Sequence, residues 1–255
     1  MAAADGGRAV LVTGASRGVG RAVAEAFAAL GDRVAVHSSG RDPGTAEAVA
    51  AALPGEGHVV VAGDLADADA VAALVAAAAE GLGGIDVLVN NAGVFVPHPP
   101  LATDYAAWQA AWSRTLGVNL LGAAHATWCA LPHLRRSGRG RVVNVSSRGA
   151  FRGEPDHPAY GASKAGLNAL GQSLARALAP EGVAVTTVAP GFVETDMAAE
   201  ALRGEAGERR RRESPFGRVA RPEEVAAAVV YLASEQAEWA SGSVLDLNGA
   251  SYLRT

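Results

Sequence analysis

Short runs of β-branched residues alternate with longer, alanine-rich amphipathic stretches along most of this sequence. In the short runs, apolar residues occupy consecutive positions, as in Val10-Leu11-Val12. Such runs are typical of strands that are buried on both faces. Strands that alternate with helices form βαβ units. The pattern therefore predicts a parallel sheet with helices packed on both of its faces.

The pattern indicates about seven strands, most of them followed by a helix. The predicted strands are residues 9–13, 33–37, 58–62, 87–90, 141–146, 184–189 and 243–246. The predicted helices are residues 18–30, 45–53, 68–82, 104–134, 157–179 and 222–233. No break in composition and no internal repeat marks a second domain, so residues 1–255 are expected to form a single α/β domain.

The segment 194–221 departs from this alternation. It is polar and rich in arginine, and it lies late in the chain. Long irregular segments of α/β enzymes often close over a binding site, so we expect a substrate lid here. Its run of four arginines, residues 209–212, is expected to be the solvated face of a lid helix. Recognition of an acidic group on a substrate is the alternative.

The composition is that of a globular protein, with 49% hydrophobic and 19% charged residues. The net charge of −4 gives no reason to expect a nucleic acid or an anionic membrane as partner. One cysteine, Cys129, cannot form an internal disulfide, which fits a reducing compartment. Residues 1–7 lack the apolar core of a secretory signal, and no stretch could span a membrane, so we expect a cytoplasmic protein. The histidines and carboxylates show no metal-ligand spacing, and no metal is predicted.

A glycine-rich turn follows the first predicted strand and precedes the first predicted helix. Gly14, Gly18 and Gly20 lie in the run Thr13-Gly14-Ala15-Ser16-Arg17-Gly18-Val19-Gly20. Glycines let a pyrophosphate approach the backbone, and the N-terminus of the next helix supplies N–H donors. The spacing differs from the G-x-G-x-x-G of many dinucleotide sites. Its place between a strand and a helix nevertheless predicts a nucleotide site.

The end of the second predicted strand indicates which dinucleotide binds. Sites for NAD usually carry a carboxylate here to hold the ribose 2′-hydroxyl, but this chain has Ser38 and Ser39. Arg17 and Arg41 are available to a 2′-phosphate. We therefore favour NADP(H), with NAD(H) as the other possibility. The alternative for both arginines is an ordinary solvated charge.

Lys164 is the single lysine among 22 basic residues, and all the others are arginine. It follows Tyr160 by one helical turn, so the two side chains are expected on one face of a helix. An ammonium is a compact charge whose pKa responds to its surroundings, unlike a guanidinium. The pair is therefore a candidate acid/base pair. The alternative is a lysine kept by chance beside a tyrosine that only packs.

Further motifs follow in a fixed order along the chain. They are Gly63-Asp64-Leu65 after the third predicted strand, Asn90-Asn91-Ala92-Gly93 after the fourth, Asn119 within a helix, Ser147 after the fifth strand and Pro190-Gly191-Phe192-Val193-Glu194-Thr195 after the sixth. Together with the glycine-rich turn and the Tyr160–Lys164 pair, they resemble the short-chain dehydrogenase/reductase family over essentially the whole chain. Within that family, the chain is similar to the oxoacyl-carrier-protein reductase branch.

The resemblance implies a Rossmann-type fold, a doubly wound parallel sheet, with a nicotinamide dinucleotide as cofactor. The residues expected to bind the cofactor are Gly14, Ser16, Arg17, Gly18, Val19, Gly20, Ser38, Ser39, Arg41, Asp64, Leu65, Asn91, Ala92, Gly93, Tyr160, Lys164, Pro190, Gly191, Val193 and Thr195. The implied catalytic residues are Asn119, Ser147, Tyr160 and Lys164. Tyr160 would be the acid/base, Lys164 would lower its pKa, Ser147 would orient the substrate oxygen, and Asn119 would help to hold a proton-relaying water.

The resulting hypothesis is an NADP(H)-dependent oxidoreductase that transfers hydride between the nicotinamide and a carbonyl or secondary alcohol. A dinucleotide-sensing regulator without turnover is the alternative. The substrate is left open: carrier-protein reductases often have a basic residue where this chain reads Ala179-Pro180-Glu181. Residues 94–98, 148–154 and the lid from Phe192 onward are expected to face the substrate. The resemblance also implies a homotetramer or homodimer.

Overall fold

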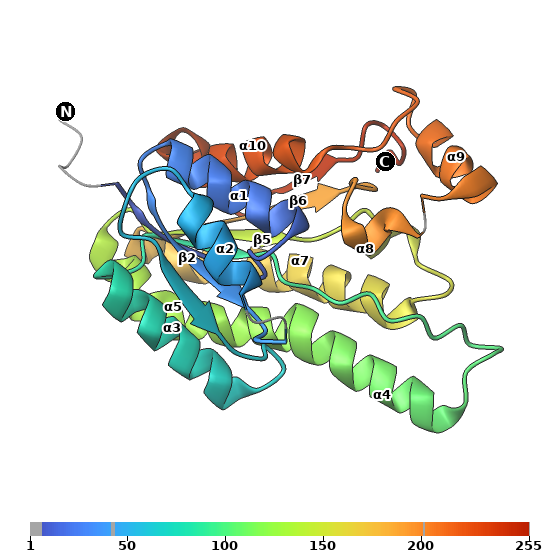
Figure 1. Cartoon of the computed structure of the whole chain (residues 1–255), viewed down its shortest axis with the longest axis horizontal. Coiled ribbons are helices and arrows are strands. Elements are labelled where there is room, and N and C mark those ends of the chain that lie inside the picture. The colour runs from blue at the N-terminus through green and yellow to red at the C-terminus, as the bar shows by residue number, and fades with distance from the viewer. Residues whose placement is uncertain (1–6, 42–43, 201, 255) are drawn as a thin grey trace.

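A computed structural model describes residues 7–41, 44–200 and 202–254. The start of the chain, where no secretory signal is expected, and residue 201 of the predicted lid lie outside these ranges. Within them, seven parallel strands form one sheet in the order β3-β2-β1-β4-β5-β6-β7 (Figure 1). The strands are β1 (Ala9–Val12), β2 (Arg33–Ser38), β3 (Val59–Ala62), β4 (Val87–Asn90), β5 (Arg141–Val145), β6 (Ala184–Pro190) and β7 (Val244–Leu247). The order reverses between β1 and β4, so the sheet is doubly wound and the predicted fold is confirmed.

Helices cover both faces of this sheet (Figure 1). On one face lie α1 (Gly18–Ala29), α2 (Thr45–Ala52) and α10 (Pro222–Leu232). On the other lie α3 (Ala68–Leu82), α5 (Gly122–Ser137) and α7 (Pro158–Leu178), with α4 (Tyr105–Leu116) against α7. Most predicted bounds differ from these by about one residue, which is within the usual uncertainty of element ends.

The inner strands are buried on both faces, as their sequences predict. Val10 and Val12 of β1 pack with α1, α2 and α10, while Leu11 between them packs with α3, α5 and α7. On β4, Val89 packs on the same side as Val10 and Val12, and Leu88 packs on the same side as Leu11. All five side chains are fully buried. Consecutive apolar residues are therefore needed because neither face of the sheet meets water.

The helix predicted over residues 104–134 was wrong in one respect, because it is interrupted. A π-helical segment, Gly117–Leu121, separates α4 from α5 and carries Asn119. The helix passes close to the end of β3 here: a Cβ on Gly122 would lie only 2.6 Å from the carbonyl oxygen of Leu65. π-helical segments are frequent at functional sites, and this one faces the carboxyl end of the sheet.

The segment 194–221 lies beyond the carboxyl ends of the strands (Figure 1). It contains two short helices that were not delimited from the sequence, α8 (Asp196–Ala199) and α9 (Gly204–Arg212). An isolated parallel bridge between Val193 and Ala220 joins its two ends. The arginine run forms the end of α9; Arg209 is exposed, but Arg210 lies over the Phe192 ring at 5.3 Å. In the described part of the chain, no helix is long and apolar enough to cross a membrane.

Candidate active site

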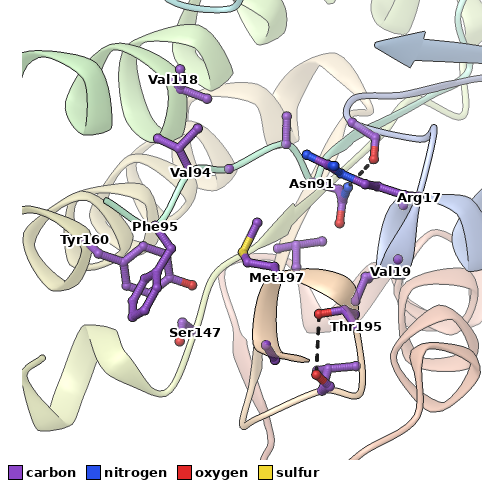
Figure 2. A pocket seen from close by; sticks show the side chains of 18 of the residues that line it. Arg17, Val19, Asn91, Val94, Phe95, Val118, Ser147, Tyr160, Thr195 and Met197 are labelled. Carbon is purple, nitrogen blue, oxygen red and sulfur yellow. Dashed lines mark hydrogen bonds between the residues drawn. The ribbon is translucent and has the colours of Figure 1, made fainter. Parts of the chain in front are cut away.

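A cavity of about 370 Å³ opens at the carboxyl ends of β1, β4 and β5. Figure 2 shows Ser147 and Tyr160 on one side of it, Arg17 and Asn91 on the other, and Met197 of α8 between them in this view. The lining includes every residue expected to bind a cofactor: Gly14, Ser16, Arg17, Gly18, Val19, Gly20, Ser38, Ser39, Arg41, Asp64, Leu65, Asn91, Ala92, Gly93, Tyr160, Lys164, Pro190, Gly191, Val193 and Thr195. Of the four expected catalytic residues, Ser147, Tyr160 and Lys164 line this cavity and Asn119 does not.

The glycine-rich turn at one end of the cavity requires its glycines. Gly14 and Gly18 have positive φ angles of 65° and 56°, a region that disfavours residues with a Cβ. A Cβ on Gly20 would lie 2.2 Å from the Gly14 carbonyl oxygen and 2.4 Å from Nδ2 of Asn91. Asn91 closes the turn from β4, since its Nδ2 donates to the carbonyls of Thr13 at 2.9 Å and Gly14 at 3.1 Å. The turn is therefore tightly packed against Asn91 on one side, and its glycines line the cavity on the other, where a ligand can bind.

His37, at the end of β2, supports the same turn from the sheet. Its Nδ1 accepts a hydrogen bond from the Gly14 N–H at 2.9 Å, so Nε2 carries the ring proton and donates to the Gly63 carbonyl at 3.0 Å. The side chain is buried, and this burial lowers the pKa of His37 below its usual value. A neutral histidine therefore joins the glycine turn to the end of β3.

A cluster of charged groups lines the cavity near the ends of β2 and β3. The Asp64 carboxylate pairs with Arg114 at 2.7 Å and with Arg41 at 3.5 Å. Burial alone would raise the pKa of Asp64, but the Ala66 N–H and the two guanidinium groups hold it below its usual value. Arg41 is 65% exposed and its ion pair is long, so its side chain is free to turn toward a ligand.

Ser147 and Tyr160 meet at the opposite end of the cavity. Ser147 follows β5, while Tyr160 lies in the first turn of α7, which begins at Pro158. The Tyr160 side chain is hydrogen-bonded to Ser147, and its ring meets the edge of Phe95 at 4.7 Å between centroids. The Phe95 ring in turn stacks on His157 at 3.5 Å. These contacts restrict the phenol to one orientation toward the cavity.

Lys164 lies one turn further along α7 and is only 3% exposed. Its Nζ donates to the Val145 carbonyl at 2.8 Å and lies 5.8 Å from the centroid of the Tyr160 ring. Burial lowers the pKa of Lys164 to about 8. The lysine is therefore held against the end of β5, on the face of α7 that Tyr160 shares.

The lowering of the Tyr160 pKa that is expected from Lys164 together with oxidised nicotinamide stays a prediction, because the structure holds the tyrosine without the cofactor. Burial raises the pKa of Tyr160 to about 12, the hydrogen bond with Ser147 opposes this rise, and the negative charge of Glu154 adds to it. A phenolate loses more hydration at this buried position than the other groups of the site return. Without a ligand, burial thus outweighs the hydrogen bond with Ser147.

Asn119 lies behind the cavity wall rather than in it. Its Oδ1 accepts from the Val94 N–H at 2.8 Å, and its Nδ2 donates to the Val94 carbonyl and to Oγ of Ser163, both at 3.1 Å. A Cβ on Gly93 would lie 3.4 Å from Asn119 Oδ1 and 3.5 Å from Lys164 Nζ. Asn119 therefore fixes the loop after β4, and it borders the same small space as the lysine.

Comparisons with known proteins agree with this geometry. The family model described as enoyl-(acyl carrier protein) reductase matches residues 14–249. A 3-oxoacyl-[acyl-carrier-protein] reductase of Aquifex aeolicus is 36% identical over 247 residues, which cover 96% of this chain and 98% of that protein. The chain belongs to the short-chain dehydrogenase/reductase family. The recognised resemblance is thereby confirmed, and the protein is an oxidoreductase of the class that interconverts CH–OH and C=O groups.

Two solved structures of short-chain dehydrogenases/reductases from Brucella melitensis share the fold. One, a short-chain dehydrogenase/reductase described as a glucose/ribitol dehydrogenase, superimposes with a TM-score of 0.89 at 32% identity and covers 97% of each chain. The other, a 3-ketoacyl-(acyl-carrier-protein) reductase complexed with NADH, has a TM-score of 0.86 at 31% identity and covers 97% of this chain and 99% of its own.

Two histidines of this short-chain dehydrogenase/reductase have structural roles that the sequence did not reveal. His37 supports the glycine-rich turn. His98 is buried; its Nδ1 donates to the Val96 carbonyl at 2.7 Å, and its Nε2 accepts from the Ala159 N–H at 3.1 Å. It thereby ties the loop after β4 to the residue that precedes Tyr160. Two features of the sequence could have indicated these roles. His37 lies in an otherwise apolar predicted strand, and His98 lies between two prolines.

His37 predicts a loss of stability on mild acidification. Its folded pKa lies below the usual value of 6.5, so between those two values the unfolded chain binds more protons and folding weakens as the pH falls. Protonation would also replace the Nδ1 acceptor for Gly14 with a donor. We expect thermal unfolding scans to show a Tm that decreases as the pH falls below about 6.5.

The matched variant is His37→Asn, whose Oδ1 can accept from Gly14 without titrating. The pKa values of His133 and His157 are also lowered by burial, so the part of the pH dependence due to His37 is the difference between wild type and variant. Identical pH dependence of the two proteins would contradict the role given to His37.

Proposed function

We propose that this protein transfers hydride between NADP(H) and a carbonyl or secondary alcohol. The observation that carries the proposal is the convergence of the glycine-rich turn and of Ser147, Tyr160 and Lys164 on one cavity. A dinucleotide fits the turn, because its glycines line the cavity without side chains and because α1 begins at Gly18 beside the cavity. When bound, the nicotinamide supplies or takes up the hydride.

Tyr160 is the proposed acid/base. In reduction its hydroxyl gives a proton to the substrate oxygen, on which negative charge develops, and in oxidation it takes that proton back. Ser147 donates a hydrogen bond to the same oxygen and holds it near the phenol. Lys164 stabilises the phenolate and binds the cofactor ribose. The positive charge of oxidised nicotinamide, when the cofactor is bound, would lower the pKa of Tyr160 further.

Asn119 is proposed as a positioning residue that supports a proton path. Its contacts with Val94 fix the loop that borders Gly93, and its Oδ1 and Lys164 Nζ border the same space beside Gly93. A water molecule held there could pass protons between the lysine and solvent. The direct contacts of Asn119 with Val94 support a structural contribution as well.

The segment 194–221 is proposed as a substrate lid on a single domain that spans residues 1–255. Thr195 reaches the glycine turn, since a Cβ on Gly18 would lie 3.3 Å from its Cγ2, and Met197 lines the cavity. The two helices of the segment lie beyond the sheet and contribute few side chains to the two hydrophobic cores. Such a segment can move without disturbing the fold.

The preference for NADP(H) is expected to depend on Arg17 and Arg41. Both are exposed and line the cavity, and no carboxylate follows β2 at Ser38 and Ser39. Replacing either arginine by alanine should lower kcat/KM for NADPH about tenfold, which corresponds to one charge-assisted hydrogen bond of about 1.5 kcal/mol. The kcat/KM for NADH should stay unchanged. Steady-state kinetics with both cofactors provide the measurement.

Arg21→Ala is the matched control for these variants. Arg21 is an exposed arginine of α1 that pairs with Glu25 and lies outside the cavity lining. The Arg21→Ala variant should leave kcat/KM for NADPH and for NADH unchanged. A wild-type enzyme that prefers NADH would contradict the assignment of cofactor.

The reaction itself is tested by following the consumption of NADPH with a panel of ketones and aldehydes. Turnover of at least one uncharged carbonyl is expected. Dinucleotide binding by calorimetry without turnover of any carbonyl or alcohol would favour the regulatory alternative.

Assembly as a homodimer or homotetramer in the cytoplasm is part of the same proposal. Leu121 and Trp128 are large apolar side chains near the start of α5, and they are 51% and 73% exposed. A second copy of the chain could cover them. The single cysteine supports a reducing compartment. Sedimentation of the purified protein gives the oligomeric state directly.

A further inference from the structure

Glu154 brings a negative charge to the substrate end of the cavity. It lies in the loop between α6 (Gly149–Arg152) and α7, and it lines the cavity together with Ser147 and Tyr160. Among the residues that the structure describes, no hydrogen bond or ion pair engages its carboxylate. Asp64, by contrast, pairs with Arg114 at the other end of the cavity. Within the described part of the chain, Glu154 is thus an acceptor without a partner.

The carboxylate lies close to the backbone of the turn that follows Ser147. A Cβ on Gly149 would lie 2.6 Å from Glu154 Oε1, so the side chain packs directly on the turn that follows Ser147. Its charge is close enough to Tyr160 to raise the pKa of the phenol. The acceptor therefore lies beside the two residues proposed to hold the reacting oxygen.

The cations near Glu154 are directed to other groups. Arg148 is 4% exposed; it donates to Glu213 and to Oγ of Ser251, and it lies over the Phe192 ring at 4.9 Å. Arg152 pairs with Glu213 at 3.1 Å. Arg210 of α9 also acts on Glu154 through its charge, and it lies over the Phe192 ring.

Burial and the surrounding charges have opposite effects on the pKa of Glu154. Burial raises its pKa and Glu213 adds to the rise, whereas the charges of Arg152, Arg148 and Arg210 oppose it. The guanidinium groups thus moderate the cost of an ionised carboxylate at this position without forming a hydrogen bond to it. An ionised carboxylate only accepts hydrogen bonds, and a site with an unpaired acceptor discriminates against substrates that cannot donate.

We propose that Glu154 determines the substrate class: it accepts a hydrogen bond from a hydroxyl or amino group near the reacting carbon, and it disfavours substrates with a carboxylate there. The inference rests on the proposed carbonyl reduction and adds to it the chemistry of the group beside the carbonyl. Uncharged ketones without a donor would be turned over, but less efficiently than their hydroxylated counterparts.

Matched substrates test this directly. Hydroxyacetone and 2-butanone have a similar size and differ in one hydroxyl group, while pyruvate carries a carboxylate beside the carbonyl. We expect wild-type kcat/KM to be about tenfold higher for hydroxyacetone than for 2-butanone, and lowest for pyruvate. In Glu154→Leu the preference for hydroxyacetone should disappear, mainly through its KM. In Glu154→Gln, which keeps an acceptor but removes the charge, pyruvate turnover should rise about tenfold.

The pH profile provides a readout that a purely structural role would not change. Removing the negative charge in Glu154→Gln should shift the Tyr160-dependent limb of alcohol oxidation to lower pH, since Glu154 raises the pKa of Tyr160. The other charged groups around this site are unchanged in the variant: Arg148, Arg152, Arg210, Glu213 and Lys164. Glu205→Gln, a 97% exposed carboxylate of α9, is the control that should leave every ratio and the profile unchanged.

The possible results separate the two proposals. An unchanged ratio of hydroxyacetone to 2-butanone in an active Glu154→Leu enzyme overturns the role of Glu154 and leaves carbonyl reduction standing. An equal loss for all three substrates, accompanied by a lower Tm, also overturns it, because the residue would then be structural. Absence of turnover of every carbonyl by the wild-type enzyme overturns both proposals.

Discussion

Tyr160→Phe should lower kcat about 10²- to 10⁴-fold with any carbonyl substrate, because the variant loses the proposed proton donor. The protein should stay folded. The ring keeps its edge contact with Phe95, and only the hydrogen bond with Ser147 is lost, which costs about 1 kcal/mol. Affinity for NADPH, measured by calorimetry, should fall by no more than about tenfold, the value of one hydrogen bond. Single-turnover kinetics with saturating NADPH isolate the chemical step.

Tyr105→Phe is the matched control, because Tyr105 is 74% exposed at the start of α4 and lies far from the cavity lining. It should be fully active. Equal activity of wild type and Tyr160→Phe would remove the tyrosine from the reaction, whatever the cofactor.

Lys164→Arg should reduce kcat about 10²-fold, although the positive charge is kept. The lysine is buried and its Nζ donates to the Val145 carbonyl, so a larger planar guanidinium cannot occupy the same space without displacing its neighbours. A misplacement of about 1 Å can cost a factor of about 10² in rate. Overpacking should also lower stability by about 1–3 kcal/mol, which a thermal scan will record. Arg176→Lys, the reverse exchange on an exposed position of the same helix, should be neutral.

Chemical labelling gives a second measurement on the same residue. A lysine-selective reagent can modify only Lys164 and the N-terminal amine in the wild-type chain. The pKa of Lys164 is lowered to about 8 by burial, so a substantial fraction is nucleophilic amine at mildly alkaline pH. Bound NADP(H) should protect it, whereas the additional lysine of Arg176→Lys should react rapidly with or without cofactor. A fully active Lys164→Arg enzyme would make the lone lysine an accident of composition.

The sequence predicted most of the fold because its signals are local. Consecutive apolar residues such as Val10-Leu11-Val12 identify a strand buried on both faces, and the strand–turn–helix context of Gly14 identifies the ligand turn. The spacing of Tyr160 and Lys164 predicts one helical face, and both side chains do line the cavity. The interruption at Gly117–Leu121 was not predicted: it lies where Gly122 approaches Leu65, and such a contact between residues distant in the sequence leaves no local signal.

The electrostatics of the site could not be predicted for a related reason. Lys164 and the cofactor are expected to lower the pKa of Tyr160, but the opposing effect of burial is a property of the folded chain and could not be predicted from the sequence. Likewise, Glu154 was one of several expected substrate-facing positions, and only the contacts of Arg148 and Arg152 with Glu213 reveal that its carboxylate lacks a partner. The sequence thus identifies the groups of the site, whereas their charges depend on packing.

The two hydrogen bonds between His37 and the glycine turn bear on the entropy of ligand binding. The Gly14 N–H donates to the imidazole at 2.9 Å and the Ala15 N–H to the His37 carbonyl at 2.8 Å, so both amides are directed into the protein. The turn is consequently preorganised, and little backbone freedom remains to be lost when an anion binds. Preorganisation of this kind raises affinity without any additional contact to the ligand. A buried imidazole thereby contributes, through the backbone of the turn, to how tightly the ligand is held.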